Sequence, residues 1–230
     1  MLVVLAIITI LAAIVLTSQS SFNRTLILDS TAYDIGLTVR SAETYGIGSR
    51  TVAAVNNVGF GVDFEASTPT VFTLFGDTSP PVTSLLQPQL CHPIPVNTGN
   101  NGIEAPNAQP GDCQYEAGSD VTVSTFAVGN GVRVSGLEAL VSTGGVATWQ
   151  KGLAKLDIVF SRPNAEPFIT ANSGGALLCS ANNAMNATGG CSLSGSIEEA
   201  CIVLASPSGG TRAIKVNMAG EITANTATCL

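Results

Sequence analysis

The feature that most limits how this chain can fold is its start, MLVVLAIITILAAIVL (Met1–Leu16), in which every residue except Thr9 is apolar and none is charged. Such a run has no polar face to present to water, so it is not the surface of a domain that folds alone. It also lacks the basic first residues and the A-x-A cleavage site of a secretory signal peptide. The residues after Leu16 indicate how the run continues.

After Leu16 the pattern becomes that of an amphipathic helix, with apolar residues three and four positions apart and most charged residues outside this stripe. No proline occurs before Pro69, and the first glycine is Gly36. The two stretches therefore predict one continuous helix from Met1 to Tyr45, roughly 65 Å long, with Gly46 and Gly48 as its stop signal. One face should pack on the rest of the chain: Leu28, Ala32, Ile35, Val39 and Ala42, widened by Leu26, Tyr33 and Leu37.

Beyond the helix the apolar pattern has a period near two, with glycine and proline turns, and predicts β-strands. The last three, Glu199–Pro207, Thr211–Asn217 and Gly220–Asn225, are separated by turn sequences and predict an antiparallel meander. We therefore predict an α+β fold, with a long N-terminal α-helix whose second half packs on a C-terminal antiparallel β-sheet domain. The other expected strands are Thr51–Glu65, Thr70–Asp77, Asp120–Val128, Gly131–Val141, Lys155–Pro163, Glu166–Asn172 and Ala176–Ser180.

The predicted organisation is an N-terminal helix of residues 1–45 followed by one β-rich domain of residues 46–230. An irregular, proline-rich insertion occupies about 78–118. Prolines are excluded from central strands and helix interiors, so this stretch is an insertion, a functional surface or a disordered segment.

Six cysteines are scattered through the chain without any C-x-x-C pair, which argues against a zinc site. An even number of cysteines after a hydrophobic start is typical of disulfides in an oxidising compartment. Small loops close most easily, so we expect Cys179–Cys191 and Cys91–Cys113 first. The remaining pair, Cys201–Cys229, is the least favoured, because a simple meander would place its members toward opposite ends.

The composition excludes several functions. The formal net charge is −7 and no stretch is basic, so the electrostatic footprint of nucleic-acid binding is missing. The single histidine, His92, has no nucleophile beside it, and no cofactor motif occurs. We therefore expect no enzymatic activity, no cofactor and no metal. Four acidic residues of the loop region could contribute to a calcium site, but they lack EF-hand spacing, and solvated carboxylates are the more ordinary interpretation: Asp77, Asp112, Glu116 and Asp120.

The apolar start, followed directly by an amphipathic helix, resembles the N-terminal segment of type IV pilins and type II secretion pseudopilins. LVVLAIITILAAI (Leu2–Ile14) is close to the usual run of that family. A second likeness, to minor pseudopilins of the H-like or FimT-like type, rests on five stretches: Ala32–Arg50, GFGVDFE (Gly59–Glu65), LFGD (Leu74–Asp77), LDIVFSRP and RAIKVNMAGEI. The resemblance covers roughly Met1–Asp77 and Leu156–Ile222.

The resemblance implies a pilin-like fold and a structural subunit of a secretion pseudopilus or type IV pilus. Residues 1–16 would then span the bacterial inner membrane once, with the domain outside the cytoplasm, and would also pack with other subunits in a filament. Expected partners are other pilin or pseudopilin subunits, the inner membrane and, if a leader exists upstream, prepilin peptidase. The membrane and assembly residues would be Leu2, Val3, Val4, Leu5, Ala6, Ile7, Ile8, Ile10, Leu11, Ala12, Ala13, Ile14, Val15 and Leu16.

The chain departs from that family at its beginning. Family members have a basic leader and a glycine, then a Phe-Thr-Leu-Ile-Glu-like start whose glutamate serves methylation and assembly. None of these precedes Met1. We expect the natural chain to begin upstream, because about five more residues would lengthen the apolar run to about 21, enough for a ~30 Å hydrocarbon core.

Two other functions remain open. The main alternative is a secreted, disulfide-bonded adhesin or binding protein whose apolar start is a signal peptide, and the other is an exported hydrolase. The sequence does not distinguish a secretion pseudopilus from an adhesive or DNA-uptake pilus, nor a major from a minor subunit, although the H-like resemblance favours a minor one.

Overall fold

A computed structural model describes residues 2–48, 50–55, 58–79, 111–162, 165–182, 191 and 195–229. For Leu2 and residues 14–21 it describes the backbone but not the side chains. His92, Cys91 and most of the proline-rich insertion lie outside the described residues.

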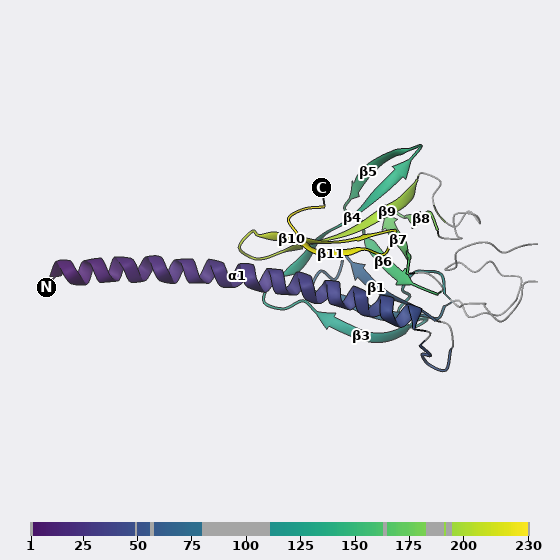
Figure 1. Cartoon of the computed structure of the whole chain (residues 1–230), viewed down its shortest axis with the longest axis horizontal. Helices are drawn as coiled ribbons and strands as arrows, with labels where there is room; N and C mark the ends of the chain where they lie inside the picture. The colour runs from purple at the N-terminus through teal and green to yellow at the C-terminus, as the bar shows by residue number, and fades with distance from the viewer. Residues whose placement is uncertain are drawn as a thin grey trace, which may run out of the picture.

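Helix α1 (Leu2–Ile47) is the first element, and Figure 1 shows that its N-terminal half projects away from the β-strands while its C-terminal half lies along them. It ends two residues later than predicted. Gly46 has a packing role besides ending the helix, because a Cβ there would lie 2.2 Å from the carbonyl oxygen of Phe160. The helix end thus approaches the sheet closely enough to require glycine.

Among the described residues, no helix is long and apolar enough to cross a membrane. The predicted single-pass location in the inner membrane is therefore wrong. The physical reason is length: the apolar run Met1–Leu16 would rise about 24 Å as a helix, less than a ~30 Å hydrocarbon core, and the polar residues Thr17 to Ser21 follow it directly.

In the part of the chain that the structure describes, eleven strands follow the helix and form one curled sheet (Figure 1). The path of neighbouring strands is β11-β10-β9-β8-β7-β6-β1-β2-β3, and β4 joins the sheet through β9 and pairs with β5. The strands are β1 (Gly59–Glu65), β2 (Val71–Asp77), β3 (Val121–Ala127), β4 (Arg133–Thr143), β5 (Val146–Lys151), β6 (Lys155–Phe160), β7 (Pro167–Ser173), β8 (Ala176–Ser180), β9 (Ser196–Ala205), β10 (Thr211–Asn217) and β11 (Ile222–Thr226).

This architecture contradicts the predicted fold class of a long helix on an antiparallel, pilin-like sheet domain. The sheet is mixed, because β8 and β9 pair in parallel through Cys179 with Ser196 and Ser180 with Ile197. The sheet is also larger than expected, and it includes strand β5, which the sequence analysis did not predict. Strand β9 explains much of the difference: it pairs with β4 and β10 along most of its length and with β8 at its start, so the sheet branches there. The expected meander of the last three strands is present as β9-β10-β11.

The main core lies between α1 and the sheet. The helix contacts β1, β6, β10 and β11 most extensively, and the core residues of these strands alternate with residues on the other face of the sheet, of which Asp63, Asp157 and Val159 are also buried. Two polar contacts add to the apolar packing: Asp29 Oδ1 lies 2.6 Å from Nε of Arg212, and Arg40 Nη2 donates to the Ile222 carbonyl at 3.3 Å. The second half of α1 is therefore fixed to the domain, while the first half projects.

Candidate assembly surface

The first described turns of α1, residues 3–13, are apolar on every side. Their large side chains are exposed, from 53% for Ile7 to 72% for Val3. Successive residues of a helix point about 100° apart, so residues 3–13 present apolar groups all round the axis. The one hydroxyl, on Thr9, donates back to the carbonyls of Leu5 and Ala6 and leaves no polar group seeking a partner. Of the expected assembly residues, Leu2, Ile14, Val15 and Leu16 have no described side chains.

The inner face of α1 lies on the sheet. All five residues expected there are buried to 1% exposure or less and belong to the main core: Leu28, Ala32, Ile35, Val39 and Ala42. They fall within an arc of about 80° around the helix axis. Small residues at this face, Ala32, Gly36 and Ala42, let the helix backbone approach the strands closely.

A second apolar stripe lies on the opposite face of the same helix. We call Phe22, Leu26, Tyr33 and Leu37 the outer stripe; they are exposed by 64%, 49%, 55% and 61%. At about 100° per residue they share an arc of about 60°, centred roughly 150° away from the inner face. The prediction that Leu26, Tyr33 and Leu37 widen the packed face is therefore wrong, because the narrow contact with the sheet does not reach them.

A groove lies beside Leu37 of the outer stripe, between α1 and residues of β2 and β3. Figure 1 shows β3 beside the helix. The volume of the groove is about 470 Å³. The stacked rings of Phe72 and Phe126, with centroids 5.1 Å apart, form part of the lining, and Leu37 stands at the helix side. Asp34 is the charged residue among those that line it. Leu37 belongs to both the outer stripe and the groove, whose lining mixes apolar side chains with polar ones such as Thr31 and Thr38.

Asp77 and Asp120, two of the four acidic residues that suggested a calcium site, accept hydrogen bonds from backbone N–H groups. Asp120 accepts from Thr78 and Ser79 at 2.9 Å each and from Glu116 at 2.8 Å. Asp77 accepts from Asp112 at 3.2 Å and from Cys113 at 2.8 Å. No group of residues that could hold a metal ion occurs in the described ranges. These carboxylates instead tie residues 111–120 to the end of β2.

A second buried group of charges lies nearby and was not predicted. Asp63 of β1 and Asp157 of β6 face each other across adjacent strands, and Lys155 Nζ lies 3.6 Å from one oxygen of each. Burial raises the pKa of Asp63 to about 6 against the opposing effect of Lys155. Burial, and then the charge of Asp63, also raises the pKa of Asp157 well above its usual value. Burial alone would lower the pKa of Lys155, but the two carboxylates raise it.

This cluster links β1 and β6 to the segment that contains Tyr115. Lys155 Nζ donates to the carbonyl of Tyr115, and the Tyr115 N–H donates to Asp157 at 3.3 Å. The sequence signal was present but weak: Asp63 stands between Val62 and Phe64, and Asp157 between Leu156 and Ile158, each flanked by apolar residues. Since the cluster fastens one segment to another, its arrangement is structural.

The two disulfides for which both cysteines are described match predicted pairs. Cys179–Cys191 and Cys201–Cys229 are formed, with Cα atoms 5.8 and 5.9 Å apart. Cys113 is disulfide-bonded as well, while its expected partner Cys91 lies outside the described residues. No described cysteine is free.

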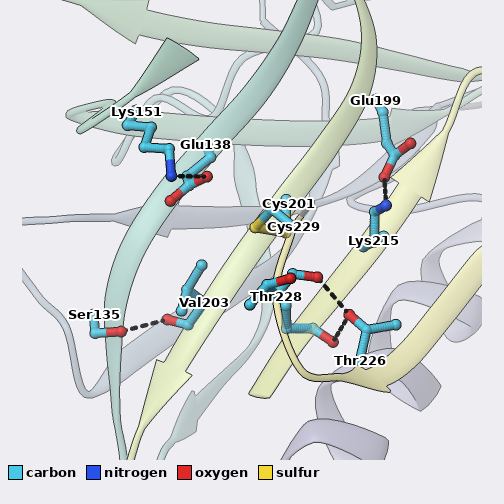
Figure 2. Close-up of a disulfide and its surroundings, with 11 residues drawn as sticks. Ser135, Glu138, Lys151, Glu199, Cys201, Val203, Lys215, Thr226, Thr228 and Cys229 are labelled. Carbon is cyan, nitrogen blue, oxygen red and sulfur yellow. Dashed lines mark hydrogen bonds and ion pairs between the residues drawn. A yellow bond between two sulfur atoms is a disulfide. The ribbon is translucent and has the colours of Figure 1, made fainter. Parts of the chain in front are cut away.

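The least favoured pair forms because the chain turns back after β11. Thr226 Oγ1 donates to the carbonyls of Ala213 and Thr228 at 3.2 Å each, and the tail then crosses to β9. Figure 2 shows this disulfide between two cross-strand ion pairs, Glu199–Lys215 at 2.8 Å and Glu138–Lys151 at 3.7 Å. Trp149 packs against the buried cluster formed by Cys201, Ala213 and Cys229.

Comparisons with models of protein families, with curated proteins and with solved structures found no match to this chain. The likeness to pilins and pseudopilins therefore rests on the sequence stretches alone. The function has to be argued from the surface that the structure describes.

Proposed function

We propose that this chain is a structural subunit of a filament, of the minor pseudopilin or pilin kind, and that it assembles through packing of its N-terminal helix. One observation carries the proposal: α1 projects from the domain, and residues 3–13 expose apolar side chains on all sides. Burial of apolar surface contributes about 25 cal/mol per Å². Packing of residues 3–13 against another apolar surface is therefore strongly favourable in free energy.

Filament packing accounts for the two halves of the helix. The second half holds the domain at a fixed position, and the first half is left free to pack among helices of other subunits. Other copies or related subunits are therefore the expected partners. Because the contact joins the projecting part of one subunit to a different part of the next, it is heterologous, and such contacts generate open filaments when they do not close into a ring. This role needs no catalytic residue.

The test is to place a charge in the projecting segment of the full chain. Ile7→Asp should abolish sedimentable assemblies, because a carboxylate buried among apolar helices costs several kcal/mol. Ile7→Leu is the matched control and should assemble normally. The thermal midpoint of the domain should not change in either variant, since Ile7 is more than half exposed and lies on the projecting part of the helix.

Two results would contradict the proposal. One is unimpaired assembly of Ile7→Asp. The other is removal of the apolar start by cleavage near Thr17–Ser21, found by N-terminal sequencing of the natural protein. Cleavage there would favour a secreted binding protein with a signal peptide.

A further inference from the structure

A short segment after the proline-rich insertion lies over an apolar patch on the face of the sheet away from α1. We call residues 111–118 the strap. The patch consists of Phe75 of β2, Val159 of β6 and Phe168 of β7, each at 1% exposure or less. Cys113 of the strap is buried against this patch, and Tyr115 packs beside it. The strap therefore shields three large apolar side chains from water.

We infer that the strap is a pH-dependent cover, which stays closed in acid and opens locally as the pH rises towards neutral. This switch does not depend on the proposed filament role and adds a conformational property to the domain. Both the attachment of the strap and the charges beneath it point to this behaviour.

Strand side chains hold the first part of the strap by its backbone. Asp77 of β2 accepts hydrogen bonds from the N–H groups of Asp112 and Cys113, at 3.2 and 2.8 Å. Thr170 Oγ1 of β7 donates to the carbonyl of Cys113 at 2.7 Å. A fully buried carboxylate thus carries two of the three contacts described here.

The next contacts of the strap come from the charged cluster on β1 and β6. Asp157 accepts from the Tyr115 N–H at 3.3 Å, and Lys155 Nζ donates to the Tyr115 carbonyl. Beneath them, Asp63 Oδ1 is buried without a hydrogen bond to any described residue and lies 3.6 Å from Lys155 Nζ. The closed strap therefore keeps an incompletely solvated carboxyl group away from water.

The covalent structure leaves the strap free to move. Cys113 is disulfide-bonded, but the other four described cysteines pair with each other, so its disulfide does not fasten the strap to a described strand. Gly111 and Gly118, at the two ends, have φ values of +111° and +89°. Glycine has the freest backbone of all residues, so these two positions can serve as hinges.

Acidic groups outnumber basic ones around the strap. The charged or titratable side chains that face it are Asp63 and Glu65 of β1, Asp77 of β2, Lys155 and Asp157 of β6, and Asp112, Tyr115, Glu116 and Asp120 on the strap or just after it. Lys155 is the basic residue of this set. One ammonium group cannot balance several carboxylates, so deprotonation adds repulsion under the closed strap.

Burial under the strap changes how the carboxyl groups bind protons. It raises the pKa of Asp63 and that of Asp112 to about 6 each, and it raises the pKa of Asp77 and that of Asp157 well above the usual value of 3.8. Opening returns water to these groups, so they bind protons more tightly in the closed form than in the open one. The closed form is therefore favoured most below pH 4 and loses stability as the pH rises through 6.

Hydrogen exchange of the full chain at pH 5 and pH 7.5, read by mass spectrometry, measures the opening. Protection factors remove the direct effect of pH on exchange chemistry. Asp63 alone predicts roughly tenfold more opening at pH 7.5 than at pH 5, if its pKa falls from about 6 to 3.8 when the strap opens. The peptide that contains the strap should lose protection by about that factor or more, and a peptide from β9 and β10 should not.

Two variants assign the effect to the buried carboxyl group. Asp63→Asn should protect the strap roughly tenfold better than the wild type at pH 7.5, because asparagine is neutral at every pH, like protonated aspartate. At pH 5 the two proteins should agree within about twofold, since most of the wild-type Asp63 is then protonated. Glu138→Gln is the matched control, because it removes a carboxylate 3.7 Å from Lys151 on β4, and it should behave like the wild type at both pH values.

Three results would overturn the inference. One is strap protection that stays constant or increases between pH 5 and pH 7.5. Another is an Asp63→Asn variant that responds to pH as the wild type does. The third is an equal loss of protection in the strap and in β9 and β10, which would show that the whole domain unfolds rather than the strap alone.

Discussion

At the scale of single residues, the Asp63–Asp157–Lys155 cluster shows how burial changes the chemistry of ordinary side chains. Two carboxylates share one ammonium group under the segment that contains Tyr115. Desolvation makes it costly for both acids to be charged, so the folded chain holds a proton that the unfolded chain releases near pH 4. The cluster is therefore a source of pH-dependent stability.

The sign of this effect follows from linkage. The pKa of Asp63 is about 6 in the folded chain and 3.8 for the isolated side chain, so folded Asp63 binds its proton more tightly. Its contribution to stability is complete below pH 4 and is lost as the pH rises through 6. Asp157, whose pKa is also raised, acts in the same direction.

Asp63→Asn should remove part of this dependence, because asparagine carries no titrating proton. Urea unfolding at pH 4 and at pH 7.5 measures the difference in unfolding free energy between wild type and variant. The wild type should lose about 2 kcal/mol relative to the variant over that interval. Glu138→Gln, in a cross-strand ion pair with the exposed Lys151, is the control and should show a much smaller change. A wild-type advantage that stays constant or grows with pH would contradict the assignment.

At the scale of elements, helix α1 was predictable because its pattern is long and local. The spacing of Leu28, Ala32, Ile35, Val39 and Ala42 has the helical period, and these side chains lie in the core. Periodicity does not report how wide the buried arc is. That width depends on how closely the helix approaches the sheet, so Leu26, Tyr33 and Leu37 were assigned to the wrong face.

The close approach of α1 can be tested at Gly46. Gly46→Ala should destabilise the domain by about 1–3 kcal/mol, even though alanine favours helices, because its Cβ would meet the backbone of Phe160. Thr44→Ala, at an exposed position one half-turn earlier, should change the unfolding free energy by less than about 0.5 kcal/mol. Chemical denaturation of both variants checks this. A Gly46→Ala variant as stable as the wild type would mean that α1 does not pack against β6 in this way.

At the scale of the whole molecule, the order in which the strands pair within the sheet could not be predicted from the sequence. Nearly every expected strand exists, since alternation and turn residues are local signals. The partners of each strand are not local. β8 pairs with β9 in parallel, and β4 pairs with β9 although four strands, β5 to β8, lie between them in the chain. Both pairings depend on long-range contacts that no short sequence pattern contains.

The candidate site shows the same limit. Residues 3–13 could be identified as apolar from the sequence, because hydrophobicity is a property of each residue type. It did not identify the groove, whose lining comes from α1, β2, β3 and the turn at Asn130. A surface assembled from segments so far apart becomes visible only after the chain has folded.

The disulfide Cys201–Cys229 joins the centre of the sheet to the end of the chain, and its removal tests the whole arrangement. It closes a loop of 28 residues, for which the loss of unfolded-state entropy predicts about 3–4 kcal/mol of stabilisation. The double variant Cys201→Ala/Cys229→Ala should therefore unfold at clearly lower denaturant concentration. The tail after β11 should also exchange its amide hydrogens faster, because the contacts of Thr226 then lack their covalent tether. Helix α1 should keep its protection on the inner face, since the disulfide lies outside the main core that holds it. Loss of protection along α1 in the double variant would show instead that the disulfide supports the domain as a whole, and the assembly surface with it.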